Sequence, residues 1–157
     1  FRPEGIGIRV GVDLSRHQAI DQSAFRMAGG QFDTARLILG GHLDLGSFLI
    51  SKLHLVPSVD LVLENDLKIF SLNGDMWYFF HQGPKTVGYV GGGWGTHLRR
   101  SDGFPNDTKI SLNIPLGFQK KLSQSMLWFG EMKVVIADDE QDSSLRLSLG
   151  FVLGRVD

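Results

Sequence analysis

Apolar and polar residues alternate along most of this 157-residue chain. In the stretch IGIRVGVDL (6–14), every even-numbered residue is apolar, whereas the odd-numbered residues are Gly7, Arg9, Gly11 and Asp13. A period of two over this length is typical of a β-strand with one apolar and one polar face. The same period recurs through the rest of the sequence.

We therefore predict an all-β fold with eight strands, at residues 6–14, 35–46, 53–64, 67–80, 86–98, 110–119, 126–137 and 145–154. The connecting turns and loops are predicted at 15–34, 46–52, 64–66, 81–85, 99–109, 120–125 and 138–143. Pro57 and Pro115 fall inside strands, where each is expected to remove a hydrogen bond from the ladder. No linker or internal repeat divides the chain, so residues 1–157 are interpreted as a single domain.

The two faces of these strands differ sharply in composition. One consists almost entirely of Leu, Ile, Val, Met, Phe and Trp, and the other carries Gly, Ser, Asn and charges of both signs. The charged residues and one histidine of the polar face are Arg9, Asp13, Arg36, His42, Asp44, Asp60, Asp75, Glu131, Lys133 and Arg146. An eight-stranded barrel has no room inside for about forty large apolar side chains, so the apolar face must point outward. That arrangement is typical of an antiparallel up-and-down transmembrane β-barrel, whose closed sheet satisfies its backbone groups in lipid.

This interpretation predicts that Leu37, Leu39, Leu112, Ile114, Leu147 and Leu149 point away from the barrel. The alternative is a soluble, lipocalin-like barrel that encloses an apolar ligand. Such a barrel would have an outer surface unusually rich in Gly and poor in Lys and Glu.

The composition makes several classes of partner and site unexpected. The net charge of −1, from 16 Lys and Arg against 17 Asp and Glu, gives no reason to expect a nucleic-acid partner. The absence of Cys excludes disulfides and thiolate metal sites. No run of 18 apolar residues suggests a transmembrane helix, and the opening FRPEG has no signal-peptide pattern.

The glycine-rich stretch YVGGGWG (89–95) is interpreted as a strongly curved strand. Because no helix is predicted after it, a phosphate-binding loop is disfavoured. Its Tyr89 and Trp94 are expected on the outer wall. Aromatic residues close to the turns at 46–52, 81–85 and 120–125 or to the C-terminus predict a girdle at one membrane interface: Phe48, Tyr78, Phe79, Phe80, Tyr89, Phe118, Trp128 and Phe151.

The strand order, with YVGGGWG, IPLGFQKKLSQSMLWFGEMKVV and LRLSLGFVLG, resembles the small eight-stranded outer-membrane β-barrel family that includes the transmembrane domain of outer-membrane protein A. The resemblance implies an integral protein of the bacterial outer membrane with periplasmic termini. It also implies a structural, anchoring or surface-interaction role without catalysis. The ending GRVD departs from the aromatic residue with which these proteins usually finish, and Phe151 is the nearest candidate.

The lumen charges are predicted to form a plug of ion pairs rather than a pore, with Glu131 in contact with Arg9 and Lys133 or Arg146 as the alternative cation. The five histidines lack metal-ligand spacing, so we expect no metal or cofactor. The acidic run at 138–142 is interpreted as a solvated loop rather than a calcium site.

Catalysis is not expected. Lipid A deacylases of this fold place a His and a Ser two residues apart on a late strand, whereas FGEMKVVIADDE (129–140) contains neither. A lipid A-modifying enzyme with an unfamiliar site remains the alternative function. The expected partners are membrane lipid, lipopolysaccharide and other outer-membrane or surface proteins, reached through the barrel wall or the loop 15–34 with its Phe25, Met27 and Phe32.

Overall fold

The computed structural model describes residues 5–15, 34–64, 67–101, 107–138 and 143–154. Within these residues it contains strands β1 (Gly5–Ser15), β2 (Thr34–Asp44), β3 (Ser47–Phe48), β4 (Ile50–Glu64), β5 (Leu67–Gln82), β6 (Thr86–Ser101), β7 (Asp107–Lys121), β8 (Met126–Ala137) and β9 (Ser144–Gly154). No helix in the described part of the chain is long and apolar enough to cross a membrane.

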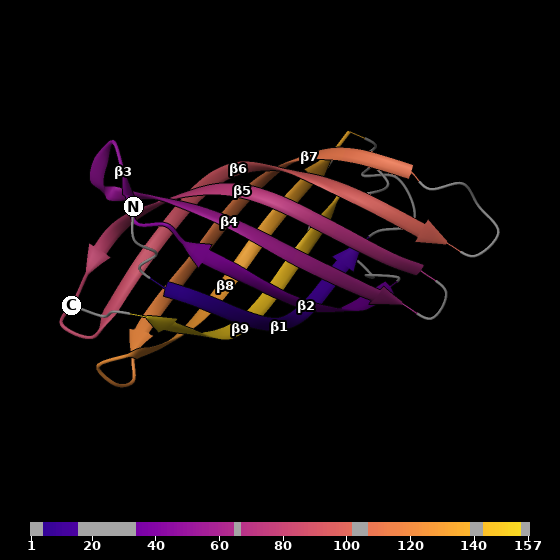
Figure 1. The fold of residues 1–157 in the computed structure, drawn as a ribbon. Helices are drawn as coiled ribbons and strands as arrows, with labels where there is room; N and C mark the ends of the chain where they lie inside the picture. Colours follow the sequence, from indigo (N-terminus) through magenta and orange to yellow (C-terminus); the bar gives the residue numbers. More distant parts are fainter. Residues whose placement is uncertain (1–4, 16–33, 65–66, 102–106, 139–142, 155–157) are drawn as a thin grey trace, which may run out of the picture.

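The strands form one closed antiparallel barrel (Figure 1). Sequential strands lie side by side, β1 pairs with β9, and the ring is completed by pairing of β2 with β4, from Leu37 opposite Leu63 to His42 opposite Ser58. The two-residue β3 only extends the connection between β2 and β4 and pairs with β4. The wall is therefore an eight-stranded up-and-down barrel, as the alternation predicted.

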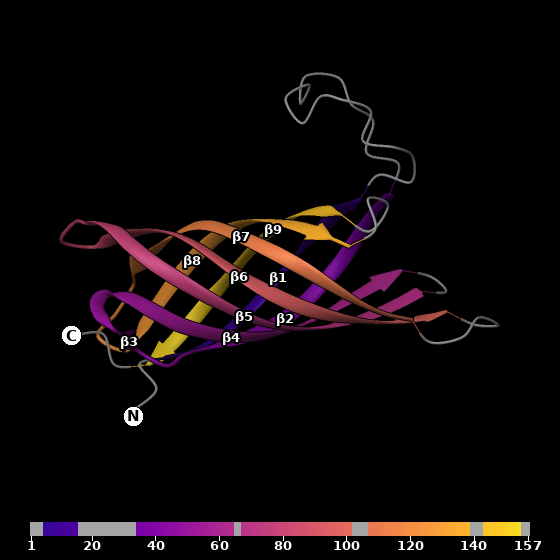
Figure 2. The same ribbon diagram turned by 90° about the horizontal axis from the view of Figure 1, so that it is seen from above.

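The barrel has two ends, which Figure 2 shows from a second direction. Gly5 at the start of β1 lies opposite Gly154 at the end of β9, and we call this the termini end. The turns after β2, β5 and β7 also lie there. The connections after β1, β4, β6 and β8 lie at the opposite end, called the loop end.

Several strands extend beyond their predicted bounds. β6 continues to Ser101 and β7 begins at Asp107, so the predicted loop 99–109 is mostly strand. The segment 46–52, predicted as a turn, contains β3 and the start of β4. Gly46 and Leu49 have φ angles of 84° and 67°, which reverse the chain around β3. The polar residues at these strand ends were interpreted as loops and turns. The structure keeps them in strands because the strands of a closed barrel stay paired beyond the apolar band.

Both strand prolines lie where a ladder stops. The β2–β4 pairs end at His42 opposite Ser58, next to Pro57. The β6–β7 pairs stop at Val90 opposite Leu116 and resume at Gly93 opposite Asn113, a gap that contains Pro115. Because proline has no N–H, the ladder is interrupted on that side while the pairing with the other neighbouring strand continues.

The apolar face points outward. Exposed fractions are 46% for Leu37, 43% for Leu39, 52% for Leu112, 42% for Ile114, 40% for Leu147 and 60% for Leu149, which confirms the predicted orientation. A soluble barrel around an apolar ligand would have the reverse arrangement. An apolar exterior over a closed sheet defines a transmembrane β-barrel.

Candidate functional site: the barrel lumen

Polar and aromatic side chains fill the inside of the barrel. The structure buries there the ten residues singled out from the sequence: Arg9, Asp13, Arg36, His42, Asp44, Asp60, Asp75, Glu131, Lys133 and Arg146. They face inward because they occupy alternate positions on strands whose other positions are apolar. The lumen has three layers: one in the centre, one nearer the loop end and one at the termini end.

Arg9 on β1 organises the central layer. Its Nε and Nη2 donate to Oδ1 and Oδ2 of Asp60, both at 2.8 Å, in a bidentate pair. Its Nη1 donates to Oε1 of Glu131 at 3.1 Å, which confirms the contact expected from the sequence. Ser58 Oγ accepts a further bond from Nη2 at 3.1 Å. A buried guanidinium thus satisfies two carboxylates from opposite sides of the barrel.

A second cation, Lys133 on β8, lies in the same layer. Its Nζ donates to Asp75 Oδ2 at 2.6 Å and lies 3.8 Å from Glu131 Oε1. Asn113 Nδ2 donates to the other oxygen of Asp75 at 3.1 Å and to Asn73 Oδ1 at 3.0 Å. Asn73 in turn donates to Asp60 Oδ2 at 3.1 Å, so the two carboxylate–cation pairs form one hydrogen-bonded network.

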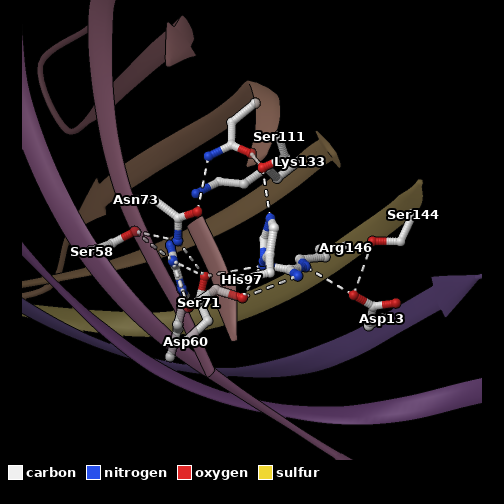
Figure 3. Close-up of polar contacts among 12 residues, drawn as sticks. Asp13, Ser58, Asp60, Ser71, Asn73, His97, Ser111, Lys133, Ser144 and Arg146 are labelled. Atoms are coloured by element: carbon white, nitrogen blue, oxygen red, sulfur yellow. Dashed lines mark hydrogen bonds and ion pairs between the residues drawn. The ribbon is translucent and has the colours of Figure 1, made fainter. Parts of the chain in front are cut away.

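Figure 3 shows the layer nearer the loop end together with Ser58, Asp60, Asn73 and Lys133 of the central layer. Arg146 Nε and Ser144 Oγ both donate to Asp13 Oδ2, at 2.8 and 3.0 Å. The ring of His97 bridges two hydroxyls, with Nδ1 2.6 Å from Ser71 Oγ and Nε2 2.6 Å from Ser111 Oγ. The first pair of contacts joins the neighbouring strands β1 and β9, and the second joins β5, β6 and β7. Arg146 Nη2 donates to Ser71 Oγ at 3.5 Å and connects the two groups across the interior (Figure 3).

The layer at the termini end is aromatic. Trp77 and Tyr89 stack with ring centroids 4.1 Å apart and planes 14° from parallel, and Val56 and Phe79 pack with them. The ring of His42 lies 5.1 Å from those of both Trp77 and Phe129. Tyr89 Oη donates to Glu131 Oε2 at 2.9 Å and so joins this layer to the central network.

The predictions for Tyr89 and Phe79 were therefore wrong, because both rings are buried in the lumen and not on the outer wall. The glycines of β6 conceal which face of the strand is which, so the sequence pattern failed there. Gly91 and Gly93 are the inward positions, and a Cβ on them would meet the backbone of β5 together with Trp77 or Asp75. Tyr89 has the same parity as these glycines and points inward with them.

The other residues of the proposed girdle lie on the outer surface. Phe48, Tyr78, Phe80, Phe118 and Phe151 are exposed by 40% or more, and Trp128 is half-buried. Phe118 and Trp128 meet edge to face with centroids 5.0 Å apart. Trp94 is 67% exposed, as expected of a wall residue.

Sequence reasoning did not single out most of the neutral members of the lumen. Asn73, Trp77 and Phe79 share the parity of Asp75 on β5, which was already assigned inward, so this signal was present in the chain. The alternation did place Asn113 of β7 on the polar face, whereas His97 lies on β6, where the glycines hide the register.

Little free space remains inside. The cavity beside Arg9, Asp60 and Lys133 measures about 10 Å³, room for about one water molecule. Among the described residues no group of three or more His, Cys, Asp or Glu side chains is arranged to hold a metal ion. The loop 15–34 and most of the acidic run at 138–142 lie outside the described residues.

Comparison with known proteins supports the assignment of the fold. No protein-family model matches the sequence, and neither does any curated protein. Among solved structures, Neisserial surface protein A has a TM-score of 0.73 at 12% identity, with 96% of each chain covered. The N-terminal β-barrel domain of Pseudomonas aeruginosa OprF gives 0.66 at 14% identity, with 97% of this chain and 98% of that chain covered. A de novo designed transmembrane β-barrel gives 0.52 at 13% identity over 98% and 97% of the two chains. The fold is that of the small eight-stranded outer-membrane β-barrels.

Proposed function

We propose that this chain is an integral protein of the bacterial outer membrane that anchors and presents its loop end at the cell surface without conducting or catalysing. The observation that supports the proposal is the filled lumen inside an apolar wall. Arg9, Asp60, Asp75, Glu131 and Lys133 satisfy one another, so the polar interior acts as a structural plug rather than an aqueous path.

The orientation follows from the two ends. Short turns and exposed aromatic side chains occur at the termini end, which is the periplasmic side in bacterial barrels of this kind. The loop end then faces outward, where lipopolysaccharide and surface proteins are the available partners. The loop 15–34 is the proposed contact, and deletion of residues 20–30 should leave the barrel folded while abolishing partner binding.

Cysteine labelling tests this orientation cleanly, because the chain contains no cysteine. Lys68, near the loop end of β5, and Lys85, in the turn at the termini end, are both exposed. In intact cells a membrane-impermeant maleimide should label K68C and not K85C, and both variants should react after lysis. The reverse pattern would show that the termini end faces outward. Labelling of neither variant in lysed cells would contradict the exposure of Lys68 and Lys85.

Conductance tests the plug. In planar bilayers the purified protein should produce no steady conductance steps, whereas a hydrated lumen would give them. Fatty-acid release from lipid A by the purified protein would instead support the enzymatic alternative. The Ser71–His97–Ser111 contacts do not favour it, because they lie inside the lumen and away from the lipid-facing wall.

A further inference from the structure

The hairpin formed by β3 and the start of β4 has an apolar tip at residues 48–50. Phe48, Leu49 and Ile50 are all exposed, and Leu49, at 85%, is the most exposed large apolar side chain among the described residues. Its φ of 67° lies in the left-handed region, which is unfavourable for a residue with a Cβ. In water, both the strained backbone and three consecutive exposed apolar residues would cost free energy, so the tip calls for an apolar partner.

Hydrogen bonds hold the base of this hairpin. Leu45 N donates to Leu55 O at 3.0 Å, and Leu55 N donates to Gly46 O at 3.3 Å. Gly46 N donates to Asp44 Oδ1 at 2.9 Å, and the same oxygen lies 2.9 Å from His54 Nδ1. The base therefore fixes the place of the tip, and the hairpin stands out at the rim of the termini end (Figure 1).

The surroundings of the tip match the boundary of a lipid bilayer. From the tip, β4 continues to Leu53, which lies opposite Tyr78, an exposed aromatic residue of the girdle. The termini end also carries exposed lysines: Lys52, Lys85 and Lys120. In the described part of this rim, the carboxylate of Asp44 is buried, so the exposed charge is positive. An apolar anchor beside lysines is typical of a membrane interface, because the lysines reach the lipid phosphates.

We propose that the tip 48–50 is a membrane contact in addition to the barrel wall, and that it inserts into the lipid interface of the leaflet at the termini end. Insertion removes Leu49 from water and so offsets the cost of its left-handed backbone. Continuity with the girdle and the neighbouring lysines favour lipid over a soluble protein or a second copy of the chain. This insertion does not depend on which side of the membrane the termini end faces, or on whether the lumen conducts.

Spin labelling shows directly where the tip lies. The full chain with Leu49→Cys is labelled with a nitroxide and folded in vesicles of phosphatidylcholine and phosphatidylglycerol. The label should collide more often with oxygen, which concentrates in lipid, than with a water-soluble nickel chelate. Gln124→Cys is the matched control, because Gln124 is exposed in the turn between β7 and β8 at the same end, and its label should prefer the chelate.

Two outcomes of this labelling would overturn the proposal. A label at residue 49 that is as accessible to the nickel chelate as the control would place the tip in water. A label that is shielded from both reagents would show that protein, and not lipid, covers the tip.

Asparagine at position 49 gives an independent test with opposite expectations for water and lipid. Asn tolerates the left-handed backbone better than Leu, so in water Leu49→Asn should leave the chain at least as stable. For a tip inserted in lipid, the loss of the apolar side chain should raise the equilibrium constant of unfolding in the same vesicles about threefold or more. Heat-modifiable gel migration establishes that the variant is folded. An unfolding constant equal to or below that of the parent chain would contradict the proposal.

Discussion

The lumen is filled in two different ways along its length. At the termini end, rings pack against bare backbone: a Cβ on Gly7 would meet His42, on Gly117 Tyr89, and on Gly150 Phe129. In the centre, buried charges hold one another at hydrogen-bond distance. The comparison shows that a single lumen can be filled by close packing of rings at one end and by ion pairs in the centre. The two regions should therefore respond to different substitutions.

Removing a cation from the central layer should have the largest effect. Lys133→Met leaves Asp75 buried without its ion-pair partner and should lower the free energy of unfolding by about 4 kcal/mol. The double variant Asp75→Asn/Lys133→Met should recover more than half of that loss, because Asn113 still has an oxygen at residue 75 to bond. Denaturant unfolding in lipid vesicles measures both, and an unchanged midpoint for Lys133→Met would mean that water replaces the pair.

Glu131 connects the two regions, so its replacement should cause the next largest decrease in the free energy of unfolding. Glu131→Ala takes an acceptor from Arg9 and from Tyr89 and should cost about 3 kcal/mol. Glu131→Gln retains an oxygen acceptor and should cost less than half as much. Equal losses for the two variants would show that charge, and not hydrogen bonding, is what Glu131 contributes.

A methyl group in the aromatic layer should have a moderate effect. A Cβ at Gly150 would collide with the Ile8 carbonyl and lie 2.6 Å from the Phe129 ring, so Gly150→Ala should destabilise by about 2 kcal/mol. Gly92→Ala is the control, because no atom lies within 4 Å of its Cβ position. Similar unfolding midpoints for the two variants would contradict ring-against-backbone packing.

The smallest effect on the free energy of unfolding is expected at His42, whose polar atoms are not used in the aromatic layer. Neither ring nitrogen of His42 has a hydrogen-bond partner among the described residues, and the ring lies close to the rings of Trp77 and Phe129. His42→Phe should therefore change the unfolding free energy by less than about 1 kcal/mol. A loss as large as that of Glu131→Ala would show that the imidazole has a polar role in this layer.

The fold was largely predictable because a period of two survives in every strand except where glycines interrupt it. The same parity placed Arg9, Asp60 and Glu131 inside, and their similar depth was enough to anticipate one contact between Arg9 and Glu131. The stronger pairing of Arg9 with Asp60 was not anticipated, because partners across a lumen depend on the stagger of the whole barrel.

Two aspects of the site could not be read from the chain. Tyr89 was placed on the wrong face because Gly91, Gly92 and Gly93 present no side chain that reveals the register. The cavity of about 30 Å³ at the loop end is lined by Arg36 together with Arg99 and Lys109, which lie on strands far apart in sequence. Such a grouping appears only when the ring of strands is closed.

The break beside Pro115 leaves a gap in the ladder between β6 and β7, with paired residues on both sides of it. Backbone amides protected by a ladder exchange with deuterium only when the strands separate, so a missing stretch of ladder is a local site of breathing. The amide of Gly91, which points toward the break at Pro115, should take up deuterium faster than the amide of Gly93, which points toward the paired part of β7. Because the strands remain paired above and below, this exchange should proceed while the barrel stays folded. Deuterium would thus enter the sheet at this gap before the wall as a whole opens.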